Sequence, residues 1–229
     1  MLVRMLIVAH RGAHDPENPG VRENTLAAFR AAAEGVELDV RRTADGVLVV
    51  LHDAAVEGVG PVAGTPRAAL PDWLPTLADA LAACRGLDVV DVEIKNSPLE
   101  AGFDPGPGLA AEVAAAVLAS PVAGRAVVTS FNLDTVHAVR AAAPELATGW
   151  LTLAGYDQEA AVETVAAHGH GLLAAADAAV TAALVGRAHD AGLRLAAWTV
   201  NDPDRVRELS AWGVDLCVTD WPRRAASAR

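Results

Sequence analysis

The sequence predicts an α/β protein with the architecture of a (β/α)8 TIM barrel, and two observations support this. Short apolar runs rich in β-branched residues alternate along the chain with alanine-rich stretches of helical periodicity, which is typical of a parallel sheet covered by helices. The alternation gives about eight strand–helix units, the number that closes such a barrel, and the 229 residues are close to its typical length of about 250. We therefore expect a single domain over residues 1–229.

Eight apolar segments are the predicted strands: 5–10, 36–40, 89–95, 126–131, 147–152, 171–175, 194–200 and 215–220. The predicted helices between them are 24–34, 77–85, 108–120, 133–142, 158–168, 178–191, 204–212 and a short one from 222. Helix starts are marked by an acidic residue with an early proline, as at Asp202-Pro203 and at Asp220 before Pro222. Helix ends are marked by glycines such as Gly213.

An extra extended run at 47–51 and the loop-like segments 53–75 and 96–107 are expected at the catalytic rim, as a short insertion after the second strand region. An open doubly wound sheet is the main competing fold. It would more often carry a glycine-rich phosphate loop after the first strand, whereas Gly12 stands alone there.

Composition excludes several classes of protein. A hydrophobic content of 52% is incompatible with disorder, and no apolar run reaches the roughly 18 residues of a membrane span. The apolar start at 1–9 is too short for a secretory leader and is better explained as a buried strand. The net charge of −11 argues against nucleic acid and stable membrane association. Cys84 and Cys217 lie in apolar surroundings typical of buried thiols, so we expect a cytoplasmic protein.

Carboxylates occur on two of the predicted strands at alternating positions. Glu37 and Asp39 are two residues apart, so both project to one face of their strand, and the same spacing pairs Glu93 with Lys95. If that face is the barrel interior, three carboxylates converge there, and burying them without compensation is costly. A cation would compensate. Oxygen ligands alone favour Mg²⁺ or Ca²⁺ over zinc, and the pattern does not choose between the two. The alternative is that these residues are ordinary surface charges.

Two histidines each end an apolar extended run and should lie at the same rim. His10 and His52 would form an acid–base pair, because histidine has an unperturbed pKa near neutrality. Arg11 and Lys95 add cationic groups that can hold an anionic phosphoryl group. The remaining histidines lie in loops, in helices or at the amino-terminal side of the barrel, where structural roles are favoured.

At these residues the sequence resembles the glycerophosphodiester phosphodiesterase family. The matching stretches, in chain order, are His10-Arg11-Gly12, Glu23-Asn24-Thr25-Leu26, Gly35-Val36-Glu37-Leu38-Asp39-Val40, Thr43-Ala44-Asp45-Gly46, His52-Asp53, Leu74-Pro75-Thr76-Leu77, Glu93-Ile94-Lys95, Ser130-Phe131, Trp198-Thr199-Val200-Asn201 and Gly213-Val214-Asp215 with Thr219-Asp220. They cover the chain from end to end, and their order and spacing together are specific.

The resemblance implies a (β/α)8 barrel that hydrolyses small-molecule glycerophosphodiesters to glycerol 3-phosphate and an alcohol. It implies that the divalent ion and the acid–base pair use the residues singled out above, that Arg11 and Lys95 bind phosphate, and that Glu23, Asn24 and Trp198 contribute to the substrate site. Two departures from the family pattern are visible: the insertion after His52-Asp53 is reduced to the modest segment 54–73, and the first helix is abbreviated while the loop 14–22 is longer. We expect both to reshape the rim locally.

Two alternative functions share this barrel. One is a lyase of the sphingomyelinase D type, which acts on choline-headed membrane lipids and would need access to a lipid surface; the acidic balance argues against it. The other is a catalytically silent barrel that binds a metal or a partner protein, which the intact set of carboxylates and histidines disfavours.

Overall fold

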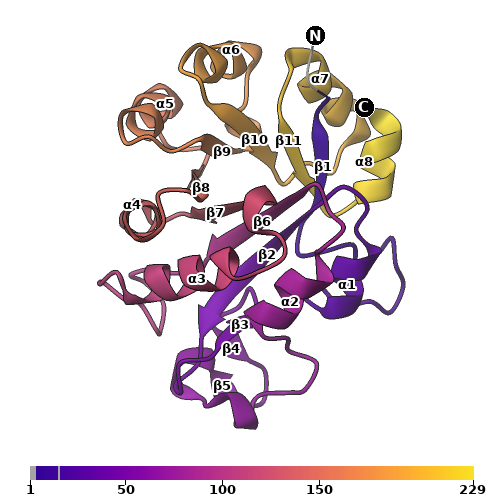
Figure 1. The fold of residues 1–229 in the computed structure, drawn as a ribbon. Coiled ribbons are helices and arrows are strands. Elements are labelled where there is room, and N and C mark those ends of the chain that lie inside the picture. Colours follow the sequence, from indigo (N-terminus) through magenta and orange to yellow (C-terminus); the bar gives the residue numbers. More distant parts are fainter. Residues whose placement is uncertain (1–3, 15) are drawn as a thin grey trace.

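The computed structural model describes residues 4–14 and 16–229, so residues 1–3 of the apolar start lie outside the described part of the chain. Eight parallel strands form the closed barrel that the sequence predicts (Figure 1). The barrel closes because β1 pairs with both β11 and β2. In their order around the barrel the strands are β1 (Leu6–Ala9), β2 (Gly35–Arg42), β6 (Val89–Ile94), β7 (Ala126–Ser130), β8 (Ala147–Thr152), β9 (Leu172–Ala176), β10 (Arg194–Trp198) and β11 (Leu216–Thr219).

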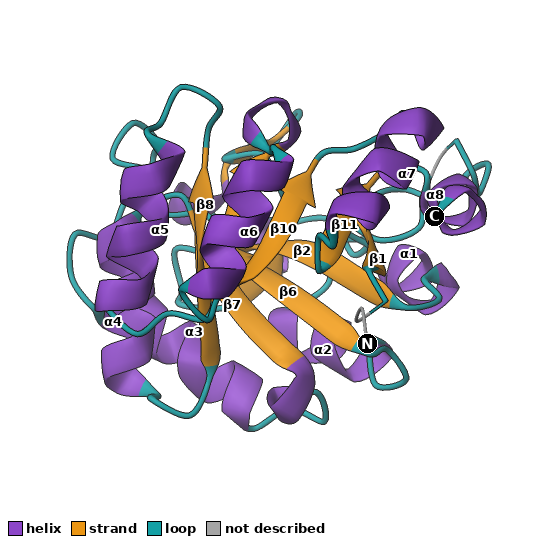
Figure 2. Ribbon diagram, turned by 90° about the horizontal axis from the view of Figure 1, so that it is seen from above, coloured by secondary structure: helices purple, strands orange, loops and turns teal. Residues whose placement is uncertain are grey.

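Helices surround the barrel on its outside (Figure 2). They are α1 (Leu26–Ala31), α2 (Leu77–Ala83), α3 (Gly108–Leu118), α4 (Leu133–Ala142), α5 (Gln158–Ala167), α6 (Ala182–Asp190), α7 (Pro203–Trp212) and α8 (Pro222–Ala228). Most begin at a capping side chain: Asn132, Asp157 and Asp202 each accept a hydrogen bond from the first turn of α4, α5 and α7. The helix start predicted at Asp202-Pro203 is therefore confirmed.

The first helix is shorter than the predicted segment 24–34. Asn24 has a φ of 54°, in the left-handed region, and Thr25 is the N-cap of α1. The helix therefore cannot begin before Leu26. Helix α6 also begins later than predicted, because residues Asp177–Ala179 form a separate 3₁₀ turn and Thr181 caps the helix.

The insertion after β2 is a small antiparallel unit packed on the barrel. Strand β2 continues beyond the predicted segment and pairs with β3 (Leu48–Val50), and β4 (Ala55–Val56) pairs with β5 (Gly60–Pro61). The 3₁₀ turns Val62–Gly64 and Arg67–Ala69 follow. A cluster of five buried residues holds the unit together: Val49, Val56, Val62, Leu70 and Leu74. Strand β3 thereby returns the chain to the rim of the barrel just before His52.

The barrel interior is apolar towards one end and polar towards the other. Its apolar part includes Val8, Val127, Leu172 and Leu216. The tight approach of β8 to β9 requires Gly149, since a Cβ there would lie 2.9 Å from the Cβ of Leu172. Towards the carboxyl ends of the strands, polar side chains replace these residues, as expected for the working end of a barrel.

The structure also bears on two expectations from composition. Cys84 and Cys217 are both free and buried, as predicted. Over residues 4–14 and 16–229, no helix has the length and apolar character that crossing a bilayer requires.

Candidate active site

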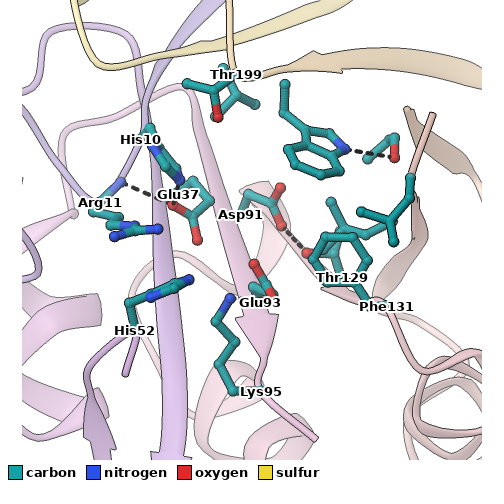
Figure 3. Close-up of a pocket in the computed structure, with 15 residues that line it drawn as sticks. His10, Arg11, Glu37, His52, Asp91, Glu93, Lys95, Thr129, Phe131 and Thr199 are labelled. Carbon is teal, nitrogen blue, oxygen red and sulfur yellow. Dashed lines mark hydrogen bonds and ion pairs between the residues drawn. The ribbon is translucent and has the colours of Figure 1, made fainter. Parts of the chain in front are cut away.

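A cavity of about 300 Å³ opens at the carboxyl ends of the barrel strands (Figure 3). Of the predicted site residues, seven line it: His10, Arg11, Glu37, His52, Glu93, Lys95 and Trp198. Asp39 lies beneath the surface with 1% of its side chain exposed. Glu23 and Asn24 lie outside the lining of the cavity. The structure therefore brings together residues from β2, β6 and β10 and from the segments that follow β1, β3 and β6.

The three predicted metal ligands are buried and converge. One carboxylate oxygen from each of Glu37, Asp39 and Glu93 can be chosen so that all lie within 4.8 Å of one another. Their register explains this, because Asp39 is the direct neighbour of Glu93 across the parallel pair β2–β6. The Lys95 ammonium lies 3.1 Å from Asp39 Oδ1 and 2.8 Å from Glu93 Oε1.

The donor set fits a divalent cation. Glu37 Oε1 is buried and has no hydrogen-bond partner among the described residues, while its Oε2 accepts the backbone N–H of Arg11 at 2.9 Å. A buried carboxylate oxygen without a partner is costly, and three carboxylates with converging oxygens are the ligands that Mg²⁺ and Ca²⁺ take.

The pKa shifts indicate an excess of buried negative charge at this end of the cavity. Burial raises the pKa of Glu37 well above its usual value, and repulsion from Asp39 and Glu93 raises it further. Burial also raises the pKa of Glu93 to about 7, although Lys95 opposes the shift. Burial acts in the same direction on Asp39, but Lys95, the hydrogen bond from Asn24 and nearby cationic groups together lower its pKa. The positive charge of Lys95 therefore does not compensate for the three buried carboxylates.

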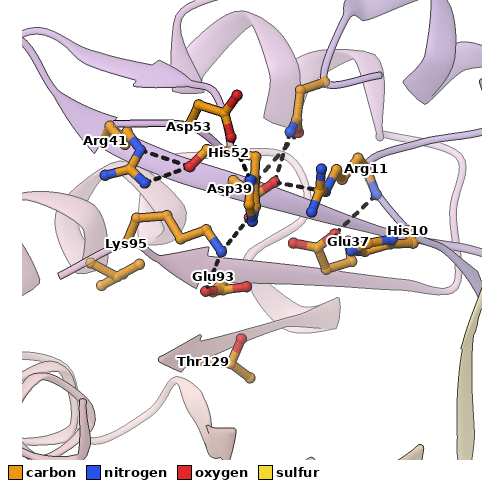
Figure 4. A network of polar contacts seen from close by, with 12 residues as sticks. His10, Arg11, Glu37, Asp39, Arg41, His52, Asp53, Glu93, Lys95 and Thr129 are labelled. Atoms are coloured by element: carbon orange, nitrogen blue, oxygen red, sulfur yellow. Dashed lines mark hydrogen bonds and ion pairs between the residues drawn. The ribbon is translucent and has the colours of Figure 1, made fainter. Parts of the chain in front are cut away.

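Glu23 and Asn24 lie outside the lining of the cavity but contact residues of the site, and Figure 4 shows Arg11 and Asp39, their partners in this polar network. The Asn24 side chain donates a 2.7 Å hydrogen bond to Asp39 Oδ2. Glu23 accepts hydrogen bonds from Arg11 Nη1 at 3.0 and 3.2 Å, and Arg11 Nε lies 3.6 Å from Asp39 Oδ2. Glu23 therefore positions Arg11, which faces the cavity, and Asn24 positions Asp39 beneath it. Direct contact of Glu23 or Asn24 with substrate stays a prediction.

The two histidines both line the cavity, and each contacts a different carboxylate. His10 Nδ1 lies 2.7 Å from Asp220 Oδ1, which leaves Nε2 facing Glu37 Oε2 at 4.0 Å. His52 Nδ1 lies 2.9 Å from Asp53 Oδ1. Because a carboxylate accepts, each Nδ1 is the protonated nitrogen and each Nε2 is free for proton transfer.

A sequence profile of the Glycerophosphoryl diester phosphodiesterase family matches residues 10–224. The chain belongs to this family. It is 28% identical to the glycerophosphodiester phosphodiesterase of Caldanaerobacter subterraneus, over 96% of each chain.

Solved structures of the family agree with the fold. A glycerophosphodiester phosphodiesterase from Parabacteroides distasonis is 25% identical, with a TM-score of 0.82 over 98% of this chain and 96% of that one. An Oleispira antarctica phosphodiesterase in complex with the product sn-glycerol-3-phosphate is also 25% identical, with a TM-score of 0.79 and the same coverage. The predicted family and the predicted barrel are both confirmed.

Sequence reasoning did not assign two acidic residues of the site. Asp91 lines the cavity, accepts a 2.7 Å hydrogen bond from Thr129 Oγ1, and has its pKa raised to about 7 by burial. Its signal was present, since Asp91, Glu93 and Lys95 alternate along β6. Asp220 was interpreted as a helix-start signal, but it contacts His10, and Trp221 occupies the N-cap of α8 without a side-chain hydrogen bond.

Three other histidines lie outside the lining of the cavity and contact one another, which the sequence did not predict. His137 on α4 lies beside His168 and His170, with His137 Nδ1 2.8 Å from His170 Nε2. His170 Nδ1 in turn lies 2.8 Å from the hydroxyl of Thr148, a residue near the start of β8. This cluster is therefore part of the amino-terminal side of the barrel.

Proposed function

We propose that this protein is a metal-dependent phosphodiesterase that hydrolyses glycerophosphodiesters to glycerol 3-phosphate and an alcohol. The observation that carries the proposal is the buried trio Glu37, Asp39 and Glu93, which shares one cavity end with two histidines. Membership of the family supports it, as does the glycerol 3-phosphate bound to the Oleispira antarctica relative.

Glu37, Asp39 and Glu93 would hold Mg²⁺ or Ca²⁺. A bound divalent ion supplies Lewis-acid polarisation of a phosphoryl oxygen. Lys95 links Asp39 to Glu93 and faces the cavity, so its ammonium can contact a phosphoryl oxygen while keeping both carboxylates in place. Arg11 lines the same cavity and offers a second cationic group to the phosphate.

His10 and His52 would provide general acid–base catalysis through their free Nε2 atoms. One histidine takes the proton of the nucleophile, and the other protonates the leaving alcohol. The nucleophile is either water or the neighbouring glycerol hydroxyl, in which case water then opens a cyclic phosphate. Trp198, whose indole N–H is held by the carbonyl of Ala174 at 3.0 Å, presents a fixed apolar wall to the substrate.

We also propose that residues 1–229 form a single domain that acts in the cytoplasm on a dissolved small-molecule substrate, without nucleic acid or stable membrane association. The net charge of −11 supports this, because it repels both nucleic acid and an anionic membrane surface.

The test is a coupled assay for glycerol 3-phosphate release from glycerophosphocholine and related diesters, with and without chelator. Chelation should abolish turnover, and Mg²⁺ or Ca²⁺ should restore it. Glu37→Gln should lower kcat by at least about 10²-fold, because it removes a ligand of the catalytic ion. The chelated variant should be at least as heat-stable as the chelated wild type, since the replaced carboxyl is buried and repelled by its neighbours.

Glu57→Gln serves as the matched control, because Glu57 is exposed in the insertion. It should leave kcat and metal dependence unchanged. Full activity of Glu37→Gln, or full activity of the wild type in chelator, would overturn the proposal.

A further inference from the structure

A second hollow, of about 640 Å³, opens beside the catalytic cavity. We call it the side groove and define it by Leu99, Phe131, Trp150, Leu153 and Tyr156, which form its apolar walls. It shares four lining residues with the catalytic cavity: Glu93, Lys95, Phe131 and Leu153. The side groove is therefore a continuation of the space in which the phosphodiester would react.

Exposed apolar side chains concentrate in this groove. Seven large apolar residues are exposed among the described residues, and four of them line it. Leu99 is 95% exposed, Leu153 52% and Tyr156 50%. A gathered apolar surface of this kind, rimmed by polar residues, marks a binding site more often than a surface of scattered single residues does.

Most of the polar side chains that line the groove are already paired within the protein. The Asn96 side chain donates to the carbonyl of Asp104 at 2.8 Å and accepts from its N–H at 2.9 Å. Asn132 donates to the Asn96 carbonyl, and the Glu100 carboxylate accepts from Arg41 at 2.9 Å. Lys95 and Glu93 pair with each other, as described above. A charged or strongly polar group of a ligand would find few free partners here, whereas a hydrocarbon would displace water from apolar walls.

The part of the groove formed by Phe131, Trp150, Leu153 and Tyr156 is also preformed. The Trp150 indole N–H donates to the carbonyl of Phe131 at 3.2 Å, and the ring contacts Tyr156 edge-to-face with centroids 5.6 Å apart. Gln158 donates to the carbonyl of Leu153 and accepts from Thr152 Oγ1, both at 2.9 Å, which ties the β8–α5 loop to the helix start. Binding would therefore require little ordering of the protein.

We propose that the side groove binds a single hydrocarbon chain of the substrate, so that this enzyme accepts phosphodiesters that carry one acyl or alkyl chain. The inference rests on the proposed function, since it places the reacting phosphate in the adjoining cavity. The chain is attached to the glycerol or to the leaving alcohol. In both cases the substrate is taken from solution as a monomer, because the net charge of −11 disfavours approach to an anionic lipid surface.

The first experiment measures kcat/KM below the micellar concentration, in two series of rising chain length. One arm uses 1-acyl-lysophosphatidylcholines, in which the chain is on the glycerol. The other uses glycerophospho-N-acylethanolamines, in which it is on the leaving alcohol. In at least one arm, kcat/KM should rise about two- to fourfold per methylene until the groove is filled, as the burial of a methylene predicts. A kcat/KM that does not rise with chain length in either arm would overturn the proposal. Cleavage of glycerophosphocholine alone, with no turnover of the chain-bearing substrates, would overturn it as well.

A double variant tests the location. Leu99→Ser with Tyr156→Ser changes two walls of the groove that do not line the catalytic cavity. The double variant should reduce the increase in kcat/KM per methylene by at least half, while its turnover of glycerophosphocholine stays within twofold of the wild-type value. Val59→Ser is the control, since Val59 is 43% exposed but lies in the insertion, outside the groove. An unchanged gain in the double variant would place the chain elsewhere and overturn the proposal.

Calorimetric titration with alkylphosphocholines of six to twelve carbons separates this inference from the proposed function, because binding needs no turnover. Affinity that rises with chain length in the wild type but not in the double variant supports the groove even if no diester is hydrolysed, a result that would refute the proposed function alone. Affinity independent of chain length, with glycerophosphocholine still hydrolysed, would refute the groove alone.

Discussion

The two histidines differ most in the carboxylate that orients each of them. The Asp220 side chain is 30% exposed, whereas that of Asp53 is 78% exposed. Asp220 is itself held, because Asn201 donates to its Oδ2 at 2.7 Å. Burial alone would raise the pKa of Asp220, but the hydrogen bonds from His10 and Asn201 outweigh it and lower the pKa. Asp220 therefore stays ionised and acts as a positioning residue for His10.

This difference predicts unequal effects of two matched substitutions. Asp220→Asn should lower kcat on the order of 10-fold to 10²-fold with little change in KM, since a neutral amide no longer fixes the proton on His10 Nδ1. Asp53→Asn should change kcat less than threefold. Steady-state kinetics across pH checks this, and the Asp220 variant should also displace one limb of the pH profile. Equal losses in the two variants would contradict the assignment.

Strand β2 is the element on which the site depends most, because it carries two of the three carboxylates proposed as metal ligands. It begins at Gly35, where three strands meet at close range. A Cβ at Gly35 would lie 2.5 Å from Val89 Cγ1 on β6 and 3.2 Å from Val8 Cγ2 on β1. The absence of a side chain therefore sets how closely β2 approaches its neighbours.

Gly35→Ala should destabilise the protein by about 1–3 kcal/mol, the usual cost of overpacking a close contact. Because the register of β2 against β6 aligns Asp39 with Glu93, metal affinity should fall as well. Gly124→Ala is the control, since nothing lies within 4 Å of its added Cβ. Urea unfolding and metal titration of the two variants provide the measurements. Equal stability of the two variants would show that β2 can shift without cost.

Elements with local determinants were predictable from the sequence. The start of α4 at Leu133 and of α5 at Gln158 each follow a capping side chain that is the preceding residue, and both were predicted correctly. The start of α1 was predicted two residues too early, at Asn24, because the left-handed backbone of Asn24 is not visible in the sequence; Thr25 caps the helix. Alternation along a strand is likewise enough to place Glu37 and Asp39 on one face. The pairing of His10 with Asp220 joins residues 210 positions apart, so no local pattern reveals it.

At the scale of the whole molecule, the two ends of the barrel differ in their response to pH. The amino-terminal side carries the cluster of His137, His168 and His170. Burial, together with repulsion from His137, Arg140 and His168, lowers the pKa of His170 to about 4. Burial and His168 also lower the pKa of His137, although Asp134 opposes that shift. The folded protein therefore takes up a proton on His170 less readily than the unfolded chain does.

The lowered pKa of His170 makes the folded protein less stable in acid. Below the unfolded histidine pKa of about 6.5 the unfolded state binds more protons, so stability falls as the pH drops towards 4, by up to about 3 kcal/mol from this residue. His170→Gln should remove that part of the acid sensitivity, whereas His189→Gln, at an exposed site, should retain it. Thermal midpoints between pH 7.5 and 4, recorded with saturating metal, test this. Parallel curves for wild type and His170→Gln would refute it.

The antiparallel pairing of β2 with β3 has a consequence for how substrate choice can differ among members of this family. The Leu51 N–H donates to the Asp39 carbonyl at 2.9 Å, and the guanidinium of Arg41 donates to the carbonyl of His52. Asp39, a proposed ion ligand, and His52, a proposed catalytic histidine, thus lie on one hydrogen-bonded unit, whereas Phe131 and Leu153 directly follow β7 and β8. Substitutions at Phe131 or Leu153 should therefore change substrate choice while leaving this unit, and the residues proposed for the reaction on it, in place.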